Sequence, residues 1–93
     1  MIQLQSPAFT FNIFPHQEKL RLVVFNNDEE YVCRIESKKT LYQFLEENNA
    51  RLFKGRLQLI KNQKELFVQV KGEIVGELSI DVFKELLTTQ STL

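Results

Sequence analysis

The sequence predicts a small α+β domain: a mainly antiparallel sheet of about six strands in a βββα-βββα order, with two short helices on one face. Two observations support this class. Apolar and polar residues alternate in six segments, which is typical of strands, and two other segments carry apolar residues at helical spacing. The order, three strands and then a helix, occurs twice along the chain.

The 93 residues fit a single domain, residues 1–93. Residues 8–48 and 52–88 follow the same plan and form a pseudo-repeat. Any two halves built from strands and a helix share these periods, so the similarity does not decide whether the two halves arose by gene duplication.

The first half contains three predicted strands, residues 9–14, 20–25 and 31–36. Pro15 interrupts the first, because proline lacks the amide proton that a sheet requires. Asn and Asp residues at 26–28 favour the turn between the second and third strands. We therefore expect an antiparallel meander.

A helix is predicted after this meander. Thr40 and Gln43 have the spacing of a capping box, and Leu41 and Phe44 lie on one helical face. Asn48 and its neighbour favour the end of the helix, since asparagine accepts the left-handed conformation there.

The second half repeats this order with strands at residues 53–59, 66–71 and 74–78. Gly72 permits a tight turn before the last strand. Ser79 can cap a final helix, with Asp81 in its first turn and Ile80 and Phe83 on its apolar face.

Strand alternation predicts which side chains face the helices. The core set is nearly all apolar: Phe9, Phe11, Ile13, Leu20, Leu22, Val24, Tyr31, Cys33, Ile35, Leu57, Leu59, Leu66, Val68, Val70, Ile74 and Leu78. Cys33 is therefore expected to be a buried, unreactive thiol. Gly76 falls in the same set, and we expect it to make room for a helix aromatic such as Phe44 or Phe83.

The opposite side of the sheet combines apolar and cationic side chains, unlike an ordinary solvated face. The candidate interface residues on it are Phe14, Arg21, Val23, Phe25, Arg34, Arg56, Phe67 and Lys71. This prediction depends on strand parity, because a bulge would move part of a strand to the other face.

Two functions fit such a face, and a third interpretation assigns it none. The first function is contact with another protein, most simply a second copy in a homodimer, since Phe and Arg suit interface cores. The second is binding of single-stranded nucleic acid, with aromatic rings stacking on bases and cations holding phosphates. Alternatively, loops and register shifts break the patch into ordinary surface. We favour the protein contact.

Nucleic acid has weaker support in the sequence. The segment LFKGRLQLIK (52–61) has Leu57 and Leu59 where an RNA-recognition motif carries stacking aromatics. In outline, strands followed by a helix, twice over, resemble the single-stranded nucleic-acid-binding repeats of the PUR-alpha type. Those repeats have four strands each, whereas three are predicted here, and no motif matches residue by residue.

Net charge, the N-terminal segment and the cysteine count together indicate in which cellular compartment the protein is found. Twelve basic and twelve acidic residues give a formal net charge of zero, so no global field attracts nucleic acid or an anionic membrane. The N-terminus lacks the basic and apolar regions of a signal peptide, and no apolar run could span a bilayer. The single cysteine suits a reducing compartment, so we expect a cytoplasmic protein.

No catalytic constellation is evident, and we expect no enzyme activity, cofactor or metal. His16 and Cys33 are the only residues of their types, too few for a zinc site. The three glycines form no phosphate-binding motif. The acidic runs lie in a predicted turn and at a helix end, where we expect solvated charges.

Overall fold

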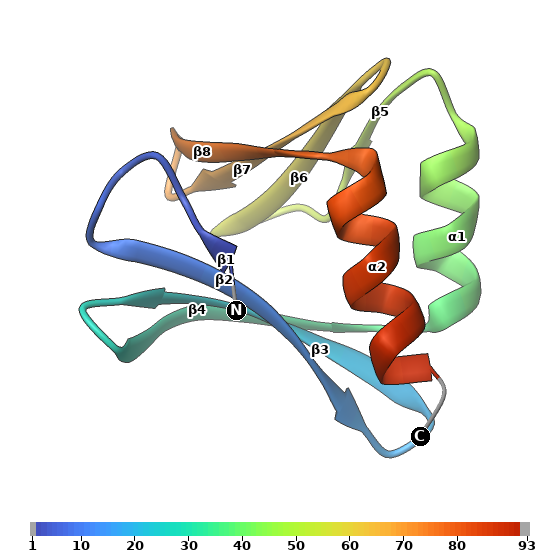
Figure 1. Cartoon of the computed structure of the whole chain (residues 1–93), viewed down its shortest axis with the longest axis horizontal. Helices are drawn as coiled ribbons and strands as arrows, with labels where there is room; N and C mark the ends of the chain where they lie inside the picture. Colours follow the sequence, from blue (N-terminus) through green and yellow to red (C-terminus); the bar gives the residue numbers. More distant parts are fainter. Residues whose placement is uncertain (1, 92–93) are drawn as a thin grey trace.

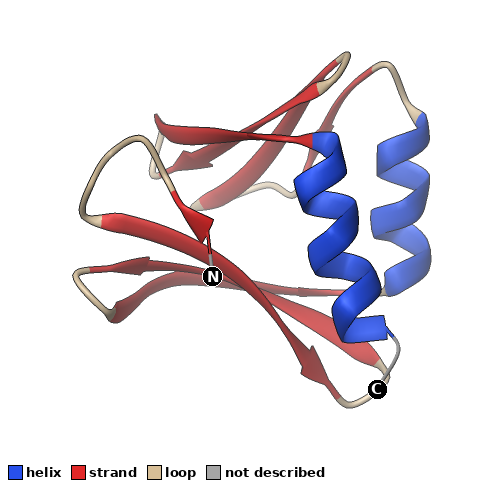
Figure 2. Cartoon of the chain, in the orientation of Figure 1, coloured by secondary structure: helices blue, strands red, loops and turns tan. Residues whose placement is uncertain are grey.

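The computed structural model describes residues 2–91 and contains two four-stranded antiparallel sheets and two helices (Figures 1 and 2). Sheet A has the order β1-β2-β3-β4 and sheet B the order β5-β6-β7-β8. In chain order the elements are β1 (Ile2–Gln3), β2 (Phe9–His16), β3 (Lys19–Asn26), β4 (Glu29–Glu36), α1 (Lys38–Glu46), β5 (Asn49–Leu52), β6 (Leu57–Asn62), β7 (Glu65–Val70), β8 (Glu73–Ser79) and α2 (Ile80–Ser91).

The α+β class is confirmed, but the predicted single six-stranded sheet is wrong. Each half contributes its own meander of four strands followed by one helix. The two shortest strands, β1 and β5, have two and four residues and were not predicted from the sequence. In Figure 1 the two sheets form the walls of a wedge, and α1 and α2 close one side of it.

The core lies between the two sheets and the helices. Phe11 of β2 stacks on Phe83 of α2, with ring centroids 6.2 Å apart, and both residues are fully buried. Leu22 from sheet A and Leu59 from sheet B are also fully buried. The strongest alternation in each half thus marks the inner face of a sheet, and the two inner faces meet each other as well as the helices.

A β-bulge changes the parity of β4. Val24 pairs with Val32 and Phe25 with Glu30, so Tyr31 is the extra residue. Beyond it, Cys33 pairs with Val23. The prediction of a buried Cys33 is therefore wrong, since its side chain lies on the outer face of sheet A and is exposed. Tyr31 and Ile35, also predicted as core, are 37% and 41% exposed, while Val32 is buried.

A second bulge has the same effect in β8. Val68 pairs with Gly76 and Gln69 with Ile74, which leaves Val75 as the extra residue. Ile74 is consequently 51% exposed instead of part of the core, whereas Val75 is buried.

Residues 4–8, between β1 and β2, cover the edge of β8. The Gln5 side-chain amide accepts from the Glu77 N–H at 2.6 Å and donates to the Glu77 carbonyl at 3.2 Å, as a neighbouring strand would. The Ser6 N–H donates to the Val75 carbonyl at 3.3 Å. Leu4 lies directly on Gly76 and is 2% exposed. Gly76 therefore makes room for Leu4, not for the helix aromatic that the sequence suggested.

Local signals explain where each helix begins, whereas the left-handed asparagine predicted at the end of α1 is wrong, because its C-cap is Glu47 in an extended conformation and Asn48 and Asn49 have no positive φ. The Ser37 hydroxyl accepts from the Thr40 N–H, so α1 begins before the predicted Thr40 cap. The prediction for α2 is confirmed, because the Ser79 hydroxyl accepts from the Val82 N–H at 3.2 Å. Neither described helix has the length and apolar character needed to cross a membrane.

Candidate interaction surface

Four of the eight predicted interface residues gather on the outer face of sheet A. Register places Phe14 opposite Arg21, Arg21 opposite Ile35, and Val23 opposite Cys33. Residues that pair across an antiparallel sheet share a face. We call this set the aromatic platform: Phe14, Arg21, Val23, Phe25, Cys33 and Ile35.

Val23 lies at the centre of the aromatic platform and is fully buried, although the face points away from both helices. Neighbouring side chains supply the cover. The rings of Phe14 and Phe25 meet edge to face with centroids 6.2 Å apart, and the Arg21 guanidinium lies 6.0 Å from the Phe14 centroid. The platform is thus a packed layer of side chains, since edge-to-face rings are a favourable arrangement.

Arg21 also forms an ion pair with Glu30. In the sheet, Arg21 lies opposite Ile35, and Glu30 lies opposite Phe25. The Val23–Cys33 pair lies between these two pairs, so the ion pair runs along the outer face past Val23. The side chains are 28% and 45% exposed, and such a pair stabilises the fold by at most about 1 kcal/mol. Its main consequence is geometric, because it holds a positive and a negative group beside an apolar centre.

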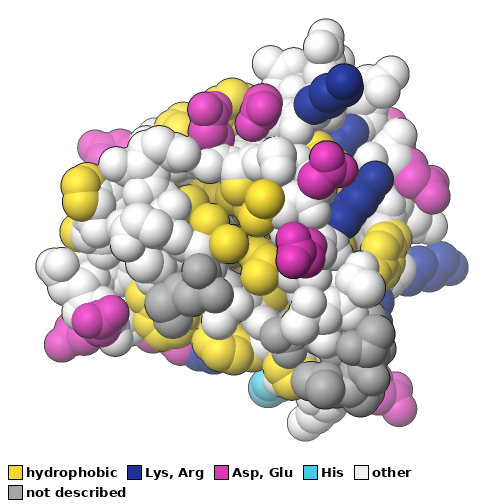
Figure 3. All heavy atoms as spheres, in the orientation of Figure 1, with side chains coloured by type: hydrophobic (Ala, Val, Ile, Leu, Met, Phe, Trp, Pro, Cys, Tyr) yellow, Lys and Arg dark blue, Asp and Glu magenta, His cyan; other side chains and the backbone are white. Residues whose placement is uncertain are grey.

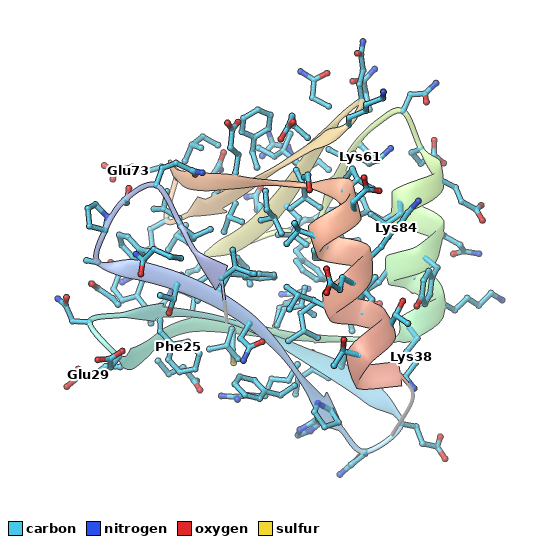
Figure 4. All side chains as sticks on the ribbon, in the orientation of Figure 1. Phe25, Glu29, Lys38, Lys61, Glu73 and Lys84 are labelled. Carbon is cyan, nitrogen blue, oxygen red and sulfur yellow. The ribbon has the colours of Figure 1, made fainter. Side chains whose placement is uncertain are left out.

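The aromatic platform leaves apolar surface accessible. Ile35 is 41% exposed, Cys33 is exposed, and Phe14 and Phe25 are partly exposed. Figure 4 shows Phe25 on the side of sheet A that is turned away from sheet B. In Figure 1 no described helix or strand lies on this side of sheet A.

The other four predicted residues lie elsewhere. Phe67 is on the outer face of sheet B, opposite Ile60 and Glu77. Arg34 pairs with Leu22 and thus has core parity, but it lies at the β4 edge, where its side chain remains exposed. The predicted single face is divided because the strands belong to two sheets.

Arg34, Arg56 and Lys71 mark a junction between the sheets. The Arg34 guanidinium lies 5.2 Å from the Phe53 ring centroid and donates to the Lys54 carbonyl at 3.4 Å. The Lys71 ammonium lies 4.1 Å from the Tyr31 centroid, and the Lys71 N–H donates to the Arg56 carbonyl at 2.7 Å. We call this set the cationic seam: Arg34, Lys54, Arg56 and Lys71, with Tyr31 and Phe53.

The cationic seam joins the edge of β4 to the loops of sheet B. Each exposed cation–π contact contributes about 0.5–1 kcal/mol. Phe53 adopts φ of +74°, which is unusual for a bulky residue, and Gly55 follows at +113°. Lys54 and Arg56 on the same loop are exposed.

Several residues of the aromatic platform and the cationic seam were not predicted from the sequence. Tyr31, Cys33 and Ile35 were assigned to the core because alternation cannot reveal an extra residue in a strand. Outside these two surfaces, the buried Lys61 was also not predicted, although it follows Leu57 and Leu59 at the next core-facing position of β6. A lysine at a core-facing strand position is unusual, and this could have identified Lys61 from the sequence.

Within residues 2–91, no group of three or more His, Cys, Asp or Glu side chains could hold a metal ion. Comparisons with protein-family models, curated proteins and solved structures find no match for this chain.

Proposed function

We propose that this chain is a non-enzymatic interaction domain of the cytoplasm that self-associates through the aromatic platform. One observation carries the proposal: a packed layer of Phe14 and Phe25 over a fully buried Val23 lies on a sheet face that no described element covers. Clusters of apolar side chains on an open face are typical of contact surfaces.

The charges of the aromatic platform and of the whole chain favour a second copy of this chain as the partner. In a two-fold dimer the same patch meets itself, so each positive group needs a negative group on that patch. Arg21 and Glu30 supply both signs beside the apolar centre, and each could exchange its partner for the equivalent group of the other copy. The zero net charge of the chain adds little repulsion between copies.

Sedimentation velocity over a wide range of protein concentration tests this proposal. The chain provides a matched pair of variants: Ile35→Glu on the aromatic platform, and Ile74→Glu on sheet B, both at exposed isoleucines. We expect the native protein and Ile74→Glu to form dimers as concentration rises, and Ile35→Glu to remain monomeric. A monomeric native protein, or two variants that behave alike, would contradict the proposal. Circular dichroism confirms that both variants fold.

Two observations favour a second candidate, binding of single-stranded nucleic acid. Each half of the chain has four strands followed by a helix, the count found in the PUR-alpha type of repeat. The cationic seam adds four exposed cations, and two of them, Arg34 and Lys71, lie over aromatic rings. Cations and aromatic rings together suit a strand of phosphates and bases.

Fluorescence polarisation with labelled oligo(dT) at low salt tests this second candidate. Affinity should fall steeply as salt increases, since the release of counterions drives such binding. Arg56→Gln should weaken binding, whereas Lys39→Gln, an exposed cation on α1, should not. Absence of binding at low salt would rule the candidate out.

A further inference from the structure

Lys61 is the one charged side chain that is buried within residues 2–91, with 7% of its surface exposed. It pairs with Leu66 of β7 and Ala50 of β5, and it occupies the last core-facing position of β6. Burial of an ammonium group is costly unless hydrogen bonds compensate for its lost hydration. The surroundings of Lys61 therefore need to supply acceptors.

One acceptor comes from the end of α1. The Lys61 ammonium donates to the carbonyl of Glu47, the C-cap residue of this helix. The carboxyl end of a helix carries partial negative charge, so the contact is favourable. An ammonium has three N–H donors. This is the one hydrogen bond that the Lys61 ammonium makes within the described part of the chain, and two of its donors remain.

A pocket of about 410 Å³ lies beside Lys61, among the end of β6, the β6–β7 turn, the end of β8 and the start of α2. Its volume is in the range of small-molecule sites. Its polar walls include Lys61, Lys64, Glu65, Ser79, Asp81 and Lys84. Figure 4 shows Lys61 and Lys84 on the same side of the molecule, near the start of α2.

The pocket contains three ammonium groups and two carboxylates, an excess of one positive charge. Neither Lys64 nor Lys84 forms an ion pair with a carboxylate of residues 2–91. Figure 3 shows basic and acidic side chains interspersed over this part of the surface. The Ser79 hydroxyl accepts from the Val82 N–H, so its own proton remains available to a ligand.

We propose that this pocket, here called the Lys61 pocket, binds a small oxyanion, a phosphate or a carboxylate. The two remaining Lys61 donors bind its oxygens from the buried end, and the ammonium groups of Lys64 and Lys84 approach from the open side. Such charge-assisted hydrogen bonds are the strong ones in proteins. Glu65 and Asp81 in the wall favour a compact ligand over an extended polyanion. This site is separate from the aromatic platform.

An NMR titration of the full chain at constant ionic strength tests the proposal, with inorganic phosphate and acetate as separate probes. Saturable shifts of amides lining the pocket, with either probe, support it, and the tighter probe identifies the ligand class. Shifts that stay linear with both probes, or saturation at residues elsewhere, overturn it.

Three variants separate a role in binding from a role in folding. Lys84→Gln should weaken anion binding about tenfold, since it removes one charge-assisted contact, while Lys39→Gln on α1 should leave binding unchanged. Lys61→Met should abolish binding, but it also removes the cap of α1. The comparison of Lys84→Gln with Lys39→Gln is therefore the decisive one, because Lys84 is exposed and its substitution should not affect folding. Equal anion affinities of these two variants would overturn the proposal even if Lys61→Met does not fold.

Discussion

Substitution of Gly76 by alanine tests how residues 4–8 close the molecule. A Cβ atom at this position would lie 2.7 Å from Leu4 Cβ and 2.9 Å from Gln5 Oε1. Non-bonded carbons normally approach to about 3.5–4.0 Å, so the loop would have to move outward by about 1 Å. That movement would strain the Gln5–Glu77 and Ser6–Val75 hydrogen bonds.

The expected loss of stability follows from these contacts. Overpacking of a core costs about 1–3 kcal/mol, and weakening of one or two hydrogen bonds adds about 1 kcal/mol. Alanine recovers about 0.5–1 kcal/mol, because glycine is unfavourable inside a strand. We therefore expect Gly76→Ala to lower the free energy of unfolding by about 1–3.5 kcal/mol, and the melting temperature by about 4–28 °C.

Urea unfolding followed by circular dichroism measures this change. The matched control is Leu4→Gly, which removes the two Leu4 carbons that approach Gly76 and leaves only Gln5 Oε1, the end of a flexible side chain, near the new Cβ. In that background Gly76→Ala should cost less than about 1 kcal/mol, so the double-mutant cycle should show clear coupling. An equal cost in both backgrounds, or a cost below about 0.5 kcal/mol in the native protein, would refute the argument.

Three further substitutions test local features of the fold. The Thr10 hydroxyl is buried without a hydrogen-bond partner among the described residues, so Thr10→Val should raise the free energy of unfolding by about 1 kcal/mol in urea; a loss of stability would contradict this. Ser37→Ala removes the acceptor for the Thr40 N–H and should cost about 1 kcal/mol, seen as a lower melting temperature; an unchanged one would contradict the cap. Lys71→Gln removes the ammonium over Tyr31 and should cost about 0.5–1 kcal/mol in urea; no loss would argue against the contact.

The parts of the fold that local patterns determine were predictable. The alternation of Phe11 and Ile13 identified an inner face, and both residues are fully buried. Ser79 and Phe83 correctly indicated the start and the apolar face of α2. Such features depend on residues a few positions apart, where period and capping rules apply directly.

The division into two sheets was not predictable in the same way. Alternation identifies strands but does not say which strands pair, and a helix between two meanders is compatible with one sheet or two. The bulge at Tyr31 has no signature in the alternation, and it moved Cys33 and Ile35 from the expected core to the aromatic platform. Residues 4–8 were missed because their contacts with Gly76 join positions about seventy residues apart.

The reactivity of Cys33 tests self-association through the aromatic platform most directly, because it is the only cysteine and lies opposite Val23. We expect the rate constant for its alkylation by N-ethylmaleimide, measured with the reagent in fixed excess, to fall several-fold from micromolar to millimolar protein in the native chain and in Ile74→Glu. In Ile35→Glu it should stay constant. A rate constant for the native protein that does not depend on protein concentration would contradict the account.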